Sequence, residues 1–158
     1  MKKLQLIITA VILTFGGNAQ ENGSWPIFRG NRQLTGISET AVPDQPKLLW
    51  AFQTGDNIKS APVVSQGKVV TGSTDGFVYC LDTEGELLWK FETNNTIEAP
   101  ALIHDGTVYI GNLDGMFYAL DLQTGELKWE YETDNQIIGS ANWWEEGGKT
   151  YIFVGSYD

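Results

Sequence analysis

Short apolar stretches separated by turn phrases run through most of this 158-residue chain. Between residues 61 and 93, four such stretches follow one another: Ala61–Ser65, Lys68–Gly72, Phe77–Asp82 and Glu86–Thr93. The turns between them contain glycine, which permits the positive φ that tight hairpin turns require. No helical period of 3.6 residues competes with this pattern. The stretches therefore predict four antiparallel β-strands.

The pattern repeats with a period near 40 residues. Trp50, Trp89 and Trp129 begin the similar phrases WAFQT, WKFET and WEYET, and they lie 39 and 40 residues apart. The phrase LDTEGELLW at Leu81–Trp89 returns as LDLQTGELKW at Leu120–Trp129. Four strands in a unit of this length are typical of a β-propeller blade, one face of which only a neighbouring blade can bury. We therefore predict an all-β fold: a partial β-propeller of about two and a half four-stranded antiparallel blades, not closed.

The same repeats divide the chain. We expect a signal peptide over residues 1–19, a lead-in segment over 20–47 and propeller repeats over 48–158, in units of about 48–86, 87–126 and 127–158. Within the first unit, Leu48–Thr54 is expected to be the outer strand of a preceding blade.

The third unit is incomplete. It ends at Asp158, which aligns with Asp75 and Asp114, just before a third strand should follow. A propeller closes with at least four blades, so we expect the chain to be an N-terminal fragment of a longer parent. The alternative is a unit that completes a ring by oligomerisation.

The first residues have the layout of a secretory signal peptide. Lys2 and Lys3 precede an apolar run from Leu4 to Phe15, and Gly17 and Ala19 offer small residues before a cut at Gln20. Such a run is too short to span a membrane well. We expect export to the periplasm or the extracellular space and no membrane span after cleavage. No cysteine follows the run, so a lipidated N-terminus is not expected.

The charge balance is acidic and excludes one class of partner. The chain has 20 acidic and 10 basic residues, a net charge of −10; without Lys2 and Lys3 the balance is 8 against 20, or −12. Such a surface repels phosphate backbones, so nucleic acid is not an expected partner.

Candidate chemistry is sparse. The single cysteine, Cys80, lies between apolar neighbours and is expected to be a small buried hydrophobe, and the single histidine, His104, flanks a turn. Asp75, Asp105 and Asp114 all precede glycine and are interpreted as turn residues rather than calcium ligands. We therefore predict no catalytic, cofactor-binding or metal-binding residues within the 158.

One stretch departs from the repeat. The segment Asn142–Glu146 reads NWWEE where SAPVV and APALI stand in the earlier units. Its paired tryptophans could form a platform that stacks on sugars, quinones or peptide side chains. The interpretation we favour is that Trp143 fills the core and Trp144 covers an exposed edge.

The repeat unit resembles the pyrroloquinoline-quinone (PQQ) repeat of quinoprotein-type and BamB-like β-propellers, and the landmarks of WD repeats are absent. The tryptophan docking motif of that family is carried by Asp121, Thr124, Gly125 and Trp129, and in the preceding unit by Asp82, Gly85 and Trp89. The phrase SWPIFRGNRQLTG at Ser24–Gly36 is similar to the lead-in of secreted PQQ-like propellers.

The resemblance implies two kinds of function. Quinoprotein dehydrogenases close seven or eight blades around PQQ and calcium, with a catalytic Asp, metal-binding Glu and Asn, and often a disulfide of adjacent cysteines, which one cysteine cannot form. PQQ and calcium are thus implied by the resemblance alone, and we predict no cofactor. BamB-like propellers act instead as binding platforms in the bacterial envelope, although that factor is a lipoprotein.

We therefore expect an exported, non-catalytic binding or assembly scaffold whose partner is a protein or another envelope ligand, together with the remaining blades of a longer parent. The alternatives are the N-terminal part of a PQQ-dependent quinoprotein oxidoreductase and an extracytoplasmic carbohydrate-binding or sensor module.

Overall fold

The computed structural model describes residues 23–38, 40–41 and 43–158. The predicted signal peptide lies outside these residues. The described part contains no helix that could cross a membrane.

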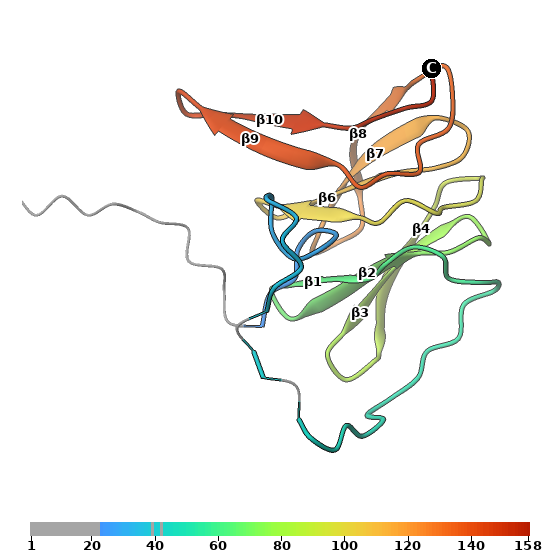
Figure 1. Ribbon diagram of the computed structural model, residues 1–158. Coiled ribbons are helices and arrows are strands. Elements are labelled where there is room, and N and C mark those ends of the chain that lie inside the picture. The colour runs from blue at the N-terminus through green and yellow to red at the C-terminus, as the bar shows by residue number, and fades with distance from the viewer. Residues whose placement is uncertain (1–22, 39, 42) are drawn as a thin grey trace, which may run out of the picture.

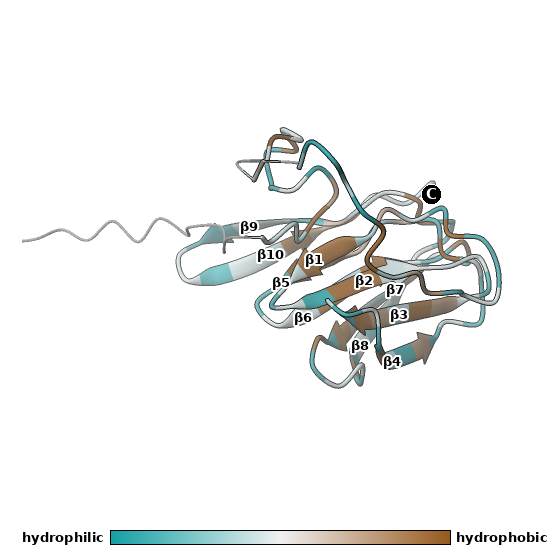
Figure 2. Cartoon of the chain, turned by 90° about the horizontal axis from the view of Figure 1, so that it is seen from below, coloured by the Kyte–Doolittle hydropathy of each residue, from teal (hydrophilic) through white to brown (hydrophobic). Residues whose placement is uncertain are grey.

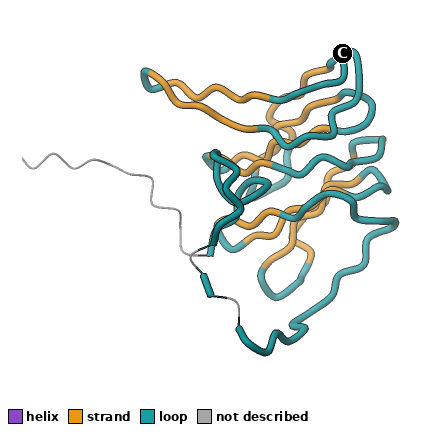
Figure 3. The backbone as a smooth tube through the Cα atoms, viewed as in Figure 1, coloured by secondary structure: helices purple, strands orange, loops and turns teal. Residues whose placement is uncertain are grey.

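The described residues form ten strands (Figures 1 and 3). The strands are β1 (Val63–Ser65), β2 (Lys68–Gly72), β3 (Phe77–Asp82), β4 (Leu87–Glu92), β5 (Leu102–His104), β6 (Thr107–Gly111), β7 (Met116–Asp121), β8 (Leu127–Glu132), β9 (Asn142–Glu146) and β10 (Lys149–Phe153).

The strands form three antiparallel sheets that follow one another along the chain. Two sheets have four strands each, in the orders β1-β2-β3-β4 and β5-β6-β7-β8, and the third pairs β9 with β10. Figure 1 shows the three sheets stacked face to face without closing into a ring. The predicted partial propeller of about two and a half blades is therefore confirmed. The sheets and the sequence repeats do not share boundaries. Trp89 and Trp129, which open the second and third sequence repeats, lie on β4 and β8, the last strands of the first and second sheets.

Packing between the sheets repeats in the same way at each junction. Ile97 occupies the space over Gly72 of β2, and Ile137 occupies the space over Gly111 of β6, so neither glycine has room for a Cβ. Both isoleucines are fully buried. Backbone hydrogen bonds accompany these contacts. Ile97 N donates to Ser73 O at 3.1 Å, and Ile137 N donates to Asn112 O at 3.0 Å.

The apolar residues gather into two clusters. The larger lies between the first two sheets and includes residues of β2, β3, β6 and β7; the smaller lies between the second sheet and β9–β10 and includes Ile27, Leu102, Phe117, Ile137 and Ala141. Figure 2 shows the contrast between the hydrophobic β1, β2 and β3 and the hydrophilic tip of the β9–β10 hairpin. The core therefore lies between neighbouring sheets, with one cluster at each junction.

Trp89 belongs to β4 of the first sheet, and its side chain packs on the second sheet. Its indole Nε1 donates a hydrogen bond to the carbonyl oxygen of Leu122 at 3.0 Å. Its ring lies against Gly125 at the corner between β7 and β8, where a side chain would have no room. Gly125 also has a φ of 75°, a conformation that favours glycine. The corner therefore needs glycine both for its backbone conformation and for lack of space. The docked Trp89 is only 9% exposed.

Polar groups hold that corner in shape. Asp121 Oδ1 accepts hydrogen bonds from the backbone N–H of Gln123 (2.8 Å) and Thr124 (3.1 Å). Lys128 Nζ lies 3.1 Å from Asp121 Oδ2, and this contact, together with the two backbone N–H groups, holds the pKa of Asp121 below its ordinary value. Asp121, Thr124 and Gly125, which carry the family motif, thus form the corner on which the indole of Trp89 packs.

The expectation that Leu48–Thr54 is an outer strand is wrong. The segment is extended but has no strand assignment, because no described strand lies beside it to form a ladder. Leu48 and Leu49 are 85% and 86% exposed. Trp50 nevertheless docks on Gly85 of the first sheet as Trp89 docks on Gly125. Docking therefore does not require that the tryptophan belong to a sheet.

The lead-in segment lies against the innermost strands (Figure 1). Trp25 pairs with Val64 of β1 through two backbone hydrogen bonds of 2.6 and 2.9 Å, and Ile103 N of β5 donates to Pro26 O at 2.7 Å. Further along, Asn142 Nδ2 of β9 donates to the carbonyl oxygen of Arg32 at 2.9 Å. The lead-in thus contacts the inner strand of all three sheets.

Replacing Trp89 with alanine should lower the free energy of unfolding by about 3–5 kcal/mol, as expected for a large aromatic side chain lost from a packed core. Trp129→Ala is the matched control, because Trp129 holds the same place in the repeat but is 43% exposed; we expect it to cost much less. Urea unfolding measures both. A loss below about 1 kcal/mol for Trp89→Ala would contradict the docking role.

Candidate functional site

A hollow between the lead-in and the β9–β10 hairpin is a candidate binding site. It measures about 460 Å³, and its lining is mainly apolar. The lining residues are Arg32, Gln33, Asn142, Trp143, Trp144 and Phe153. Mainly apolar hollows with a few polar groups are typical of binding sites.

Strand pairing sorts the aromatic side chains of the hairpin onto two faces. Trp143 pairs with Ile152 and Trp144 pairs with Tyr151, and side chains alternate along a strand. Trp143 and Ile152 pack against the smaller core cluster. Trp144, Tyr151 and Phe153 lie on the opposite face and are 49%, 45% and 56% exposed. We call this opposite face the outer face of the hairpin.

Arg32 lies over the outer face. Its guanidinium carbon is 5.1 Å from the centroid of the Trp144 ring, a contact worth about 0.5–1 kcal/mol at an exposed site. Among the described residues Arg32 forms no ion pair. Arg29 and Arg32 are the only arginines in a chain of net charge −10. The hollow therefore combines apolar surface with a cation that is available to an acidic group.

Trp143 supports the inner side of the hollow. Its ring stacks on His104 with centroids 4.9 Å apart and an interplanar angle of 28°. His104 Nε2 is buried and lies 3.4 Å from Glu145 Oε1, without the geometry of a hydrogen bond. The structure therefore places Trp143 against the core and Trp144 at the surface, as the favoured interpretation of the sequence expects.

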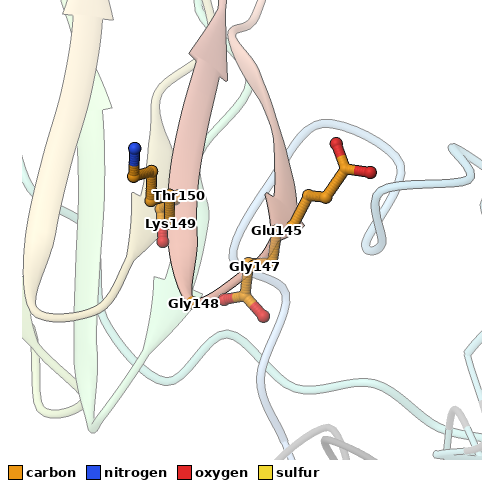
Figure 4. Close-up of a pocket in the computed structure, with 6 residues that line it drawn as sticks. Glu145, Gly147, Gly148, Lys149 and Thr150 are labelled. Carbon is orange, nitrogen blue, oxygen red and sulfur yellow. The ribbon is translucent and has the colours of Figure 1, made fainter.

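A second hollow, about 350 Å³ in volume, lies at the tip of the hairpin between Glu145 and Thr150. Figure 4 shows that the carboxylate of Glu145 and the ammonium group of Lys149 point away from each other. Because its charged groups do not converge, we do not treat this hollow as a site.

The aspartates that precede glycine all lie in turns, as predicted. Asp75 also locks a junction: its carboxylate accepts hydrogen bonds from Gly55 N (2.7 Å), Phe77 N (3.0 Å) and the Tyr79 hydroxyl (2.7 Å). Burial, the largest single effect, raises the pKa of Asp75, but these hydrogen bonds together outweigh it and leave the pKa below 3.8. Burial and the bond to Asp75 raise the pKa of Tyr79.

No three His, Cys, Asp or Glu side chains of the described part come together as metal ligands would. The described residues thus contain no carboxylate cluster of the kind that would hold calcium. Cys80 is fully buried on β3, which raises the pKa of its thiol to about 12. The predicted lack of catalytic and cofactor-binding residues stays a prediction.

Sequence reasoning identified the paired tryptophans but missed Arg32, Gln33 and Phe153 as their neighbours. The restriction of arginine to the lead-in was a visible signal. It did not show that residue 32 meets residue 144, because that contact depends on the path of the lead-in across the sheets.

Comparison with known proteins gives a consistent family. The family model described as "Outer membrane protein assembly factor BamB" matches residues 39–149. The crystal structure of BamB from Moraxella catarrhalis is 26% identical, with a TM-score of 0.60, and the match covers 69% of this chain and 34% of that one. No curated protein sequence matches at a significant level.

Quinoproteins share the fold. Quinohemoprotein alcohol dehydrogenase ADHIIG from Pseudomonas putida HK5 is 24% identical, with a TM-score of 0.70 over 86% of this chain and 23% of that one. The Comamonas testosteroni quinohemoprotein alcohol dehydrogenase is 22% identical, with a TM-score of 0.67 over 87% and 24%. The chain thus spans about a quarter to a third of the length of these structures and of BamB. That it is a fragment of a longer parent stays a prediction.

Asp75→Asn should lower the free energy of unfolding by about 1.5–3 kcal/mol at pH 7, the size expected for hydrogen bonds to a charged group. The folded pKa of Asp75 is depressed, so its stabilisation is present above about pH 3.8 and is lost as the pH falls through the folded value. The variant should therefore lose less stability than the wild type in acid. Urea unfolding at a series of pH values measures this.

Asp105→Asn is the matched control, since it removes the same charge from a turn where no described residue donates a hydrogen bond to the carboxylate; Thr107 Oγ1 donates only to the backbone carbonyl of Asp105. Equal effects of the two substitutions would show that charge, rather than the lock on Gly55 and Tyr79, is responsible.

Cys80 should react with iodoacetamide at pH 8 only when the chain unfolds, because the thiolate is the reactive form and the folded pKa is about 12. Mass spectrometry with and without urea measures the rate. Labelling of the folded chain as fast as the unfolded chain would contradict the buried position of the thiol.

Proposed function

The chain belongs to the PQQ-like β-propeller family whose model bears the name of the outer membrane protein assembly factor BamB, and on that premise we propose that it is an exported, non-catalytic binding or assembly scaffold of the bacterial envelope. Its partner is an extracytoplasmic protein. The family match supports the platform role, and the basic, apolar start of the sequence supports export.

The observation that carries the proposal is the outer face of the β9–β10 hairpin. Trp144, Tyr151 and Phe153 expose about half of their side chains on one surface, and Arg32 lies over it without an ion pair among the described residues. Aromatic residues and arginine are the residue types enriched in protein interfaces, and they supply most of the binding energy there. The face therefore suits a protein segment that carries an apolar side chain beside an acidic group.

Two alternatives make different predictions for the same chain. The N-terminal part of a PQQ-dependent oxidoreductase would bind PQQ with calcium, and a carbohydrate module would use Trp144 to stack on sugar rings. All three functions can be tested on one preparation.

The test is a titration of the full chain with three ligand classes: urea-unfolded outer-membrane proteins diluted into buffer, envelope oligosaccharides, and PQQ with calcium. We expect binding to the proteins, with affinity at least tenfold lower for Trp144→Ala, which removes a central aromatic contact. Leu88→Ala on β4 is the matched control, because Leu88 is similarly exposed at 46% but lies away from the hollow.

Binding of oligosaccharide alone, or of PQQ with calcium alone, would replace the scaffold proposal with the corresponding alternative. Binding to proteins that both variants weaken equally would remove the outer face as the site.

A further inference from the structure

A buried nitrogen atom without a hydrogen bond lies between the second sheet and the β9–β10 hairpin. It is Nε2 of His104, the single histidine of the chain and the last residue of β5. Glu145 Oε1 of β9 is 3.4 Å away, but the contact lacks the geometry of a hydrogen bond. A buried polar atom without a partner is destabilising. A change in the charge of His104 would therefore change how the hairpin packs.

The length of the hairpin brings Glu145 to this place. Five residue pairs join β9 to β10, whereas three join β5 to β6. Because side chains alternate along a strand, Glu145 shares a face of β9 with Trp143, whose ring stacks on His104 at a centroid distance of 4.9 Å. The histidine thus contacts two side chains of β9, one aromatic and one acidic.

Protonation of His104 strengthens both contacts. Histidine side chains change charge between about pH 5 and pH 8, and an imidazolium N–H donates to a carboxylate in a short, charge-assisted hydrogen bond. The positive ring is also attracted to the face of the Trp143 indole. Burial opposes the charge, but the side chains of His104 and Glu145 are 15% and 46% exposed, so water still solvates both groups.

The charges of the hairpin leave this pair free to form. Glu145 has no other ion pair among the described residues. The ammonium group of Lys149 on β10 points away from the Glu145 carboxylate (Figure 4). Glu146 follows Glu145 on β9 and therefore lies on the opposite face. No cation of the hairpin thus competes with His104 for Glu145.

The charges of the second sheet and the lead-in do not oppose the pair either. Asp105, the next residue after the histidine, adds a second negative charge to the turn. Lys128 of β8 donates to a carbonyl of the same turn, and its charge is matched by Asp121 at 3.1 Å. Arg32 of the lead-in lies over Trp144, on the other face of the hairpin. The surroundings therefore favour a positive charge on the imidazole.

We propose that His104 and Glu145 form a proton-dependent latch between β5 and the β9–β10 hairpin. When His104 takes up a proton from water, its imidazolium forms the missing hydrogen bond to Glu145 and holds the hairpin more tightly on the second sheet. When the proton is lost, the hydrogen bond and the ion pair are lost with it. The stability of this junction thus falls as the pH rises through the titration of His104. Because Trp143 lines the hollow, the latch also fixes one wall of that hollow.

The other described contacts of this junction do not titrate. Ile137 fills the space over Gly111, and its N–H donates to Asn112 O at 3.0 Å. Apolar and backbone contacts keep the same charge at every pH. A pH dependence of the junction is therefore attributable to the latch.

Amide hydrogen exchange of the full chain measures the latch. Protection factors, which correct for the intrinsic pH dependence of exchange, are compared at about pH 5.5 and about pH 8. We expect the amides of β9 and β10 to be about two- to fivefold better protected at the lower pH, the size that a partly exposed ion pair supports. The amides of β1–β4 should show no such change.

The charge of His104 is followed in the same samples. Because the chain has one histidine, the ¹H–¹⁵N signals of its imidazole report that charge without ambiguity. The midpoint of the change in hairpin protection should coincide with the midpoint of the imidazole titration. Different midpoints would assign the pH dependence to another group and overturn the proposal.

Three variants separate the latch from a general effect of charge. Glu145→Gln keeps the shape of the side chain but removes its charge, so the gain in protection at the lower pH should disappear. His104→Gln should have the same effect. Glu146→Gln is the matched control, because it removes the same charge from the opposite face of β9 and should keep the gain. If His104→Gln does not fold, Glu145→Gln decides, since that side chain is about half exposed.

Three results would overturn the latch: unchanged hairpin protection while His104 titrates, an equal gain in Glu145→Gln, or loss of the gain in Glu146→Gln. A histidine that stays neutral at the lower pH would overturn it as well. No ligand enters the experiment, so its outcome is independent of the proposed scaffold function.

Discussion

The indole of Trp89, on the last strand of the first sheet, holds that sheet to the second. The hydrogen bond from Trp89 to Leu122 O and the packing of its ring on Gly125 require the corner of one sheet and the last strand of another at the same place. Neither half buries its apolar surface alone. Ile97 on Gly72 joins the same two sheets, whereas Ile137 on Gly111 joins the second sheet to the third, where no tryptophan docks among the described residues. Because each sheet packs only against its neighbours, the stability of the stack is approximately the sum of the stabilities of its sheets and junctions.

The lead-in adds a second kind of connection. It contacts β1, β5 and β9 through Trp25, Pro26 and Arg32, so one segment connects the inner strands of all three sheets. It also places Arg32 beside β9. One short segment thus contributes to the stability of the stack and supplies the cation of the candidate site.

Trp129 and Trp144 are both about half exposed, but they stand in different relations to the repeat. Trp129 keeps its place in the repeat, and no glycine corner of the described residues lies against its ring. The outer face around Trp144 departs from the repeat, since Trp144 stands where the earlier units carry Ser65 and His104. A departure from the repeat is where a function particular to this chain is expected, since repeat residues are explained by packing between sheets.

The sequence by itself determined the strands, their antiparallel order and the all-β class, because alternation, glycine turns and the 40-residue period are local properties that recur. It also identified Trp143 and Trp144 as unusual. Only the tertiary structure decided which tryptophans are buried, since Trp50, Trp89 and Trp129 read alike and differ only in whether a glycine corner lies opposite. The same holds for Leu48–Thr54, which has the sequence of a strand but no strand beside it to bond. Arg32 contacts Trp144 because the lead-in crosses all three sheets. These residues are 112 positions apart, and the periodicity of the sequence does not predict a contact over that separation.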